Sequence, residues 1–186
     1  MRLRRVQFFF IAGLLCLHYL PLLAKPSIGQ IYALNFTDVD GNTLSTADGH
    51  VTVIVLSKQA DVDKARLVGD RIPEYCLGNP RYRLITVIGF ENGHSRPTRM
   101  ILNALARRRL NAEAKRLQPR YLAKKLTRDP RGDVFAMLDF DGAIAGKLGI
   151  SVGSSEFQVL VLDGKGKLLE RWTDVPTPEQ LAAVLK

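Results

Sequence analysis

The chain has 186 residues, of which 46% are hydrophobic and 24% are charged, and its formal net charge at pH 7 is +9. This length suits one domain with a proper core. The positive charge bears on solubility and on weak attraction to anionic surfaces, not on fold. Of the two cysteines, Cys16 lies in an N-terminal apolar run that we expect to be removed. Cys76 is then the one remaining cysteine, and a single cysteine can form neither an internal disulfide nor an intramolecular dithiol cycle.

Residues 1–24 have the layout of a secretory signal peptide. Three arginines precede the apolar run 6–17, and Ala24 is a suitable cleavage residue. The run is short for a membrane-crossing helix, although an uncleaved anchor in the inner membrane is the alternative. We therefore predict a periplasmic protein, exported by a cleaved signal peptide, whose residues 25–186 form a single domain.

The first half of this domain alternates strands with a helix. The turn signal "DVDG" at Asp38–Gly41 predicts an N-terminal β-hairpin. Val51–Ser57 is aliphatic without alternation, which predicts a strand buried on both faces. A helix is predicted to begin near Asp61, whose carboxylate we expect to cap it, and to carry Cys76 near its far end. Tyr82–Phe90 predicts a second buried strand.

The second half continues the alternation. Ser95 and Pro97 mark the start of a helix to Leu117, and Pro119 is expected to begin a second, shorter helix. A third strand follows in Val134–Gly142, and then a short helix.

The chain is predicted to end with a β-hairpin that turns at Asp163–Gly166 and a last helix. Thr177 and Gln180 form a capping box at the start of that helix. The order predicts a mixed central sheet with helices on both faces.

These motifs, in this order, resemble the thioredoxin-like fold in its periplasmic and peroxiredoxin-like forms. "IGQIYALNFTDVDGNTLS" is similar to the opening hairpin, and "VLVLDGKGKLLERW" with "TPEQLAAVL" to the closing hairpin and last helix. Within the superfamily, "LDFDGAIAGKLGI" and "GSSEFQVLVLDGKGKLLERW" resemble the YtfJ-like periplasmic proteins. The resemblance implies an α/β fold: a thioredoxin-like three-layer α/β/α sandwich with a mixed central sheet, an N-terminal β-hairpin and a helical insert.

The chain departs from this family at its reactive site. Active members carry Cys-x-x-Cys at the start of the helix after the first central strand, and the resemblance puts Asp61 and Lys64 near the two cysteine positions. Disulfide exchange needs a thiolate, which neither a carboxylate nor an ammonium can replace. The family also keeps a cis-proline before the penultimate strand, and the matching stretch 152–158 contains no proline. Lys58, Asp61 and Lys64 are therefore candidates for a degenerate active-site surface without catalytic residues.

Two functions remain open. The first is an exported, redox-inactive protein that binds a periplasmic protein partner through this surface or through the basic insert. The alternative is a thiol enzyme that uses Cys76 alone, through mixed disulfides or peroxide reduction. A lone cysteine at that place is most simply a small buried apolar residue, and its exposure discriminates between the two. The spacing of the histidines indicates no metal site, and no cofactor is expected.

The predicted helical insert 96–131 is strongly basic. Only Glu113 and Asp129 oppose its positive charges. A solvated helix face is one interpretation, and weak contact with an anionic membrane surface or an acidic protein is the other. Nucleic acid is not expected outside the cytoplasm. The basic residues are Arg96, Arg99, Arg107, Arg108, Arg109, Lys115, Arg116, Arg120, Lys124, Lys125, Arg128 and Arg131.

Overall fold

A computed structural model describes residues 26–90, 93–150 and 157–186. The predicted signal peptide lies outside these residues, as does most of the stretch where the family has its cis-proline. Within the described ranges, no helix is long and apolar enough to cross a membrane.

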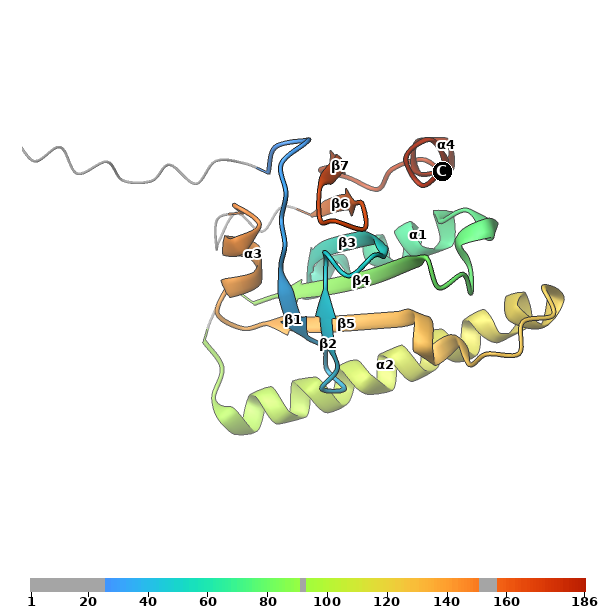
Figure 1. The fold of residues 1–186 in the computed structure, drawn as a ribbon. Coiled ribbons are helices and arrows are strands. Elements are labelled where there is room, and N and C mark those ends of the chain that lie inside the picture. The colour runs from blue at the N-terminus through green and yellow to red at the C-terminus, as the bar shows by residue number, and fades with distance from the viewer. Residues whose placement is uncertain (1–25, 91–92, 151–156) are drawn as a thin grey trace, which may run out of the picture.

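Five strands form one mixed sheet in the order β5-β4-β3-β6-β7 (Figure 1). The parallel part consists of β3 (Val51–Lys58), β4 (Tyr82–Gly89) and β5 (Val134–Asp139). An antiparallel part, β6 (Gln158–Leu162) and β7 (Leu168–Trp172), completes it. The sheet confirms the predicted strands, their shared sheet and the late hairpin.

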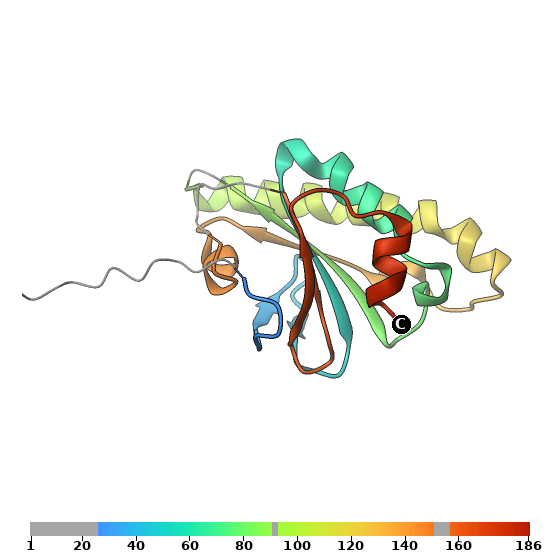
Figure 2. The ribbon, with the colours of Figure 1, turned by 90° about the horizontal axis from the view of Figure 1, so that it is seen from above.

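Three helices pack on one face of the sheet: α1 (Val62–Arg71), α2 (Arg96–Ala123) and α4 (Pro178–Val184). Val53 and Val55 of β3 point to this face, where they share a core with α1 and α4. Figure 2 shows α1 and α2 together on one side of the strands. Two consecutive right-handed crossovers, β3-α1-β4 and β4-α2-β5, step in the same direction along the sheet and therefore place both helices on one face.

The opposite face is covered by a small hairpin and a short helix. The hairpin pairs β1 (Asn35–Thr37) with β2 (Thr43–Ser45), and α3 (Ala143–Lys147) packs beside it. Ile54 and Leu56 of β3 point to this side and share its core with residues of the hairpin. The predicted N-terminal hairpin, short helix and layered α/β/α arrangement are thus confirmed.

The structure confirms two predicted helix starts but not the predicted break in the long helix. Thr177 and Gln180 form the predicted capping box of α4, and Ser95 caps α2 through the backbone N–H of Thr98 at 3.4 Å. However, α2 is one continuous helix, and the predicted break at Pro119 was wrong.

Tertiary packing explains why α2 continues through a proline. Pro119 lacks the N–H that an interior helical residue donates, and such a proline costs about 3 kcal/mol. Leu117 and Tyr121 flank it and are buried against Val134. The Tyr121 hydroxyl also donates a hydrogen bond to the carboxylate of Asp133. Burial on both sides of the proline offsets its cost, which propensity alone does not show.

The second central strand is buried more completely on one face than on the other, although Ile88 near its end is buried on the less covered face. On the side of β1 and β2, Ile85 and Val87 of β4 have 0% and 1% of their surface exposed. On the side of α1 and α2, Leu84 and Thr86 are only half-buried. A central parallel strand is usually covered on both faces, so the prediction of a fully buried strand was wrong here, and the gap defines a groove.

Candidate functional site

The junction after β3 holds the three residues predicted to form a degenerate active-site surface. Lys58 ends β3, a 3₁₀ turn (η1, Gln59–Asp61) follows, and α1 then begins. Asp61 occupies the N-cap position, but its side chain accepts no hydrogen bond from the helix. A side-chain cap requires an extended backbone, and Asp61, at φ −98° and ψ 14°, continues the 3₁₀ turn instead. The expected carboxylate cap was therefore wrong.

Lys64 lies in the first turn of α1. Its Nζ atom is 3.6 Å from Asp174 Oδ1 and 5.5 Å from the centroid of the Phe157 ring. Asp174 precedes α4, and Phe157 precedes β6. Lys64 thus connects α1 to two C-terminal segments by partly exposed contacts, which contribute little stability individually.

Cys76 lies outside α1, contrary to the prediction. The helix ends at Arg71 because Ile72, which precedes Pro73, is extended, as the residue before a proline prefers. Cys76 belongs to a separate 3₁₀ turn (η2, Glu74–Cys76) and is 6% exposed. Burial raises the pKa of its thiol to about 11, although nearby Lys124 partly opposes the shift. The thiol is therefore protonated at neutral pH.

A groove of about 730 Å³ lies between α1 and α2. Its floor is the half-open face of β4, with Leu84, Thr86 and Ile88. Small side chains line the walls, including Ala65 on α1 and Ala106 on α2. The volume falls in the range of about 300–1,000 Å³ that is common for small-molecule sites.

Ion pairs connect the two helical walls toward the C-terminal end of α1. Arg116 on α2 lies 2.6 Å from Asp70 on α1 and also binds Glu113. These hydrogen bonds, first with Glu113 and then with Asp70, raise the pKa of Arg116 above its ordinary value. Arg120 binds Glu74 of η2 in the same region. These ion pairs link the walls of the groove at this end.

Many of the predicted basic charges have internal partners. Arg107 and Arg131 both pair with Asp40 at the tip of the β1–β2 hairpin, and Arg128 pairs with Asp133. Together with Arg116 and Arg120, they hold the surrounding segments against α2. Contact of this region with an anionic membrane surface stays a prediction. Arg99 and Lys124 make no ion pair but donate hydrogen bonds to backbone carbonyls. Among the described residues, the basic side chains of the insert with neither an ion pair nor a hydrogen bond are Arg96, Arg108, Arg109, Lys115 and Lys125.

An aromatic cluster lies where β4 and β5 end. The rings of Phe90 and Phe140 stack with centroids 4.9 Å apart, and His94 meets Phe90 edge-on at 5.0 Å. The Arg99 guanidinium lies 4.9 Å from the Phe140 centroid. The sequence analysis missed this cluster, although a phenylalanine directly after each of two parallel strands was its available signal. It offers a flat ring surface for stacking.

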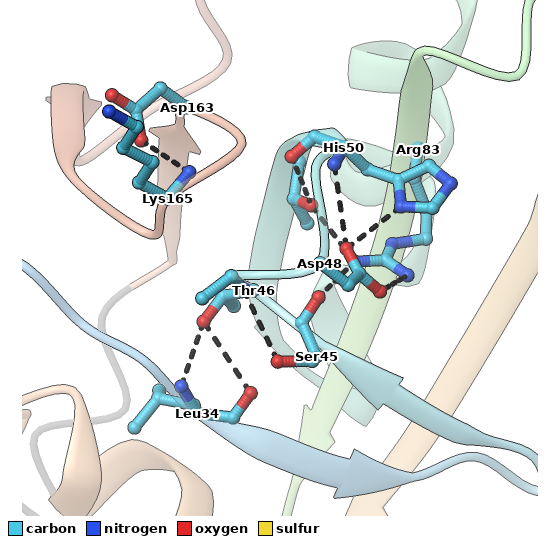
Figure 3. Close-up of polar contacts among 10 residues, drawn as sticks. Leu34, Ser45, Thr46, Asp48, His50, Arg83, Asp163 and Lys165 are labelled. Carbon is cyan, nitrogen blue, oxygen red and sulfur yellow. Dashed lines mark hydrogen bonds and ion pairs between the residues drawn. The ribbon is translucent and has the colours of Figure 1, made fainter.

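An ion pair between buried Arg83 and partly exposed Asp48 lies at the other end of the sheet (Figure 3). Arg83 of β4 binds both carboxylate oxygens of Asp48, at 3.0 and 3.1 Å, and also contacts Thr52 Oγ1 at 3.2 Å. His50 Nδ1 lies 2.8 Å from Asp48. Burial alone would raise the pKa of Asp48, but the hydrogen bonds from Arg83 and His50 hold it at about 2.

This arrangement anchors the loop between β2 and β3 to the sheet, and no motif in the sequence indicates it. Across the described parts of the chain, no group of three His, Cys, Asp or Glu side chains is placed to bind a metal ion.

No protein-family model and no curated protein sequence matches the chain. The chain does match solved structures, among them the following three. A secreted thiol-disulfide isomerase from Corynebacterium glutamicum is 12% identical over 83% of this chain and 82% of its own, with a TM-score of 0.52. A putative thioredoxin from Neisseria meningitidis is 15% identical over 86% and 89%, with a TM-score of 0.51. A DsbF homologue from Corynebacterium diphtheriae is 12% identical over 97% of both chains, with a TM-score of 0.50. These similarities show that the fold is thioredoxin-like.

Proposed function

We propose that this protein is exported, keeps a thioredoxin-like fold without dithiol chemistry, and acts by binding a partner in the periplasm. The observation that carries the proposal is the state of Cys76. It is the one cysteine in residues 25–186, and it is buried with a raised pKa.

The chemistry of thiol exchange supports this proposal. The reacting species is the thiolate, and catalytic cysteines have a pKa lowered by a helix N-terminus or a nearby cation. A thiol with a pKa of about 11 is ionised to roughly one part in ten thousand at pH 7. The helix start that carries cysteines in active relatives here carries Asp61 and Lys64.

Two observations support export. Residues 1–24 have the pattern of a signal peptide, and a structural neighbour with the same fold is a secreted thiol-disulfide isomerase. The YtfJ-like resemblance of the C-terminal motifs points the same way. We assign partner binding to the surface near the ends of β3–β5.

A turnover assay tests the proposal. The exported protein, incubated with insulin and dithiothreitol, is expected to precipitate insulin no faster than dithiothreitol alone, and to consume no hydrogen peroxide above buffer. Cys76→Ser is the matched control. Turnover that disappears in Cys76→Ser would establish the single-cysteine enzyme instead. Turnover that survives the substitution would contradict both functions.

A further inference from the structure

We propose that the groove between α1 and α2 binds an amphipathic carboxylate with a long acyl chain. The chain would lie on the open face of β4, and the carboxylate would lie between Arg66 of α1 and Arg109 of α2. This inference goes beyond the proposed function, because it names a small-molecule ligand and a site distinct from the degenerate active-site surface.

The floor of the groove favours an apolar occupant. Leu84 and Thr86 are half-buried on a central strand whose opposite face is closed. Covering this apolar surface with an acyl chain is favourable by about 25 cal/mol per Å² removed from water. Ala65, Gly69 and Ala106 leave room for it, since none of them extends far from its helix.

The shape of the groove favours an elongated occupant. Its lining runs along α1 from Val62 to Ile72 and continues to Cys76. Ten helical residues of α1 span about 15 Å at about 1.5 Å per residue. Arg66 precedes Asp70 on α1, and Arg109 precedes Arg116 on α2. A ligand whose head lies between Arg66 and Arg109 would therefore extend its apolar tail toward Cys76, past the Arg116–Asp70 ion pair.

The two arginines favour a negatively charged head. Arg66 and Arg109 line opposite walls, and within the described residues neither makes an ion pair or a hydrogen bond. The acids near them on α2 are already engaged, because Arg116 binds both oxygens of Glu113. Guanidinium groups bind carboxylates in a planar, two-bond geometry. Two such groups on opposite walls can hold one carboxylate between them.

Three acids line the groove, and two of them are paired: Glu113 with Arg116, and Asp133 with Arg128. Among the described contacts, Asp63 has no such partner and therefore opposes this ligand; it lies on α1 three residues before Arg66. One acid against two arginines leaves the local balance positive. The residue therefore provides a test of sign, since its removal should strengthen binding of an anion and weaken binding of a cation.

Calorimetric titration of the exported protein tests the proposal, with dodecanoate and dodecyltrimethylammonium as probes, both below their micelle concentrations. Dodecanoate is expected to bind with one site, and the cation at least tenfold more weakly. Arg66→Gln and Arg109→Gln should each weaken dodecanoate binding about threefold to tenfold. Arg108→Gln, on the same helix but outside the groove lining, should leave it unchanged. Asp63→Asn should strengthen it.

A second variant tests the location. Thr86→Phe places a large side chain on the groove floor and should abolish dodecanoate binding while the far-ultraviolet circular dichroism stays unchanged. If this variant fails to fold, the surface arginine variants still decide. Equal binding of both probes, or unchanged binding in Arg66→Gln and Arg109→Gln, would overturn the proposal. Neither result would alter the insulin assay, so this inference and the proposed function can fail separately.

Discussion

The two faces of β4 show how one strand serves two purposes. Toward the β1–β2 hairpin, Arg83, Ile85 and Val87 are all buried, and Arg83 is fixed by Asp48. Toward α1 and α2, Leu84 and Thr86 stay half-exposed at the floor of a groove. The closed face contributes stability, and the open face forms the floor of the groove.

The difference arises from what covers each face. The hairpin and α3 place Phe36, Leu44 and Leu148 directly on the closed face. On the open face, α1 packs chiefly on β3 and α2 on β5, so the strand between them is left partly uncovered. A binding site can therefore occur on a central strand whose own sequence is typical of a core.

The sharpest test of this comparison is a pair of alanine substitutions on adjacent residues. Ile85→Ala, on the closed face, should cost about 2–5 kcal/mol, because it removes a fully buried side chain and leaves a cavity. Leu84→Ala, on the open face, should cost less than about 2 kcal/mol, because its side chain is already partly hydrated. Urea unfolding of both variants measures the difference. Equal losses would mean that the groove is closed in solution.

Sequence periodicity revealed the strands but not this asymmetry. "YRLITVIG" is aliphatic on both sides, and only the spacing between α1 and α2 decides which side is covered. Likewise, the sequence predicted a helix start at Ser95 and a capping box at Thr177, because caps are local. It failed at Pro119, where burial of Leu117 and Tyr121 overrides a local preference, and at the Arg83–Asp48 pair, which joins residues 35 positions apart.

The Arg83–Asp48 ion pair of the closed face should come next in size. Asp48→Ala leaves the buried Arg83 guanidinium without its partly exposed carboxylate partner, which should cost about 1–3 kcal/mol. Arg83→Met, which removes the charge and keeps an apolar stem, is the matched control and should cost less. Chemical unfolding at pH 7 compares the two variants. An Asp48→Ala variant as stable as the native protein would show that Arg83 is solvated.

The same pair predicts an acid-dependent loss of stability. The pKa of Asp48 falls from 3.8 to about 2 on folding, so its contribution is present above pH 3.8 and is lost as the pH falls toward 2. Melting temperatures of the native protein and of Asp48→Asn should therefore converge over this interval. Curves that stay parallel from pH 4 to pH 2 would contradict this assignment.

Cys76, on the groove side, should give a smaller effect with the opposite pH dependence. Its pKa rises to about 11 on folding, so the stability from burying the neutral thiol is complete below the ordinary thiol pKa of about 8.5 and is lost as the pH rises toward 11. Cys76→Ala should cost about 1 kcal/mol at pH 7 and flatten this alkaline loss. Rapid reaction of the folded native protein with a disulfide reagent at pH 7 would show that the thiol is accessible.

The smallest expected effect distinguishes two helix starts. Thr177 accepts the backbone N–H of Gln180 at 3.3 Å, and Gln180 accepts the N–H of Thr177 at 2.7 Å. Thr177→Ala should therefore cost about 1 kcal/mol. Asp61 makes no such bond, so Asp61→Ala should change stability by no more than about 0.5 kcal/mol. A loss for Asp61→Ala as large as that for Thr177→Ala would mean that its carboxylate caps α1 in solution. The junction would then be a stabilising helix start, and the case for a binding surface there would weaken.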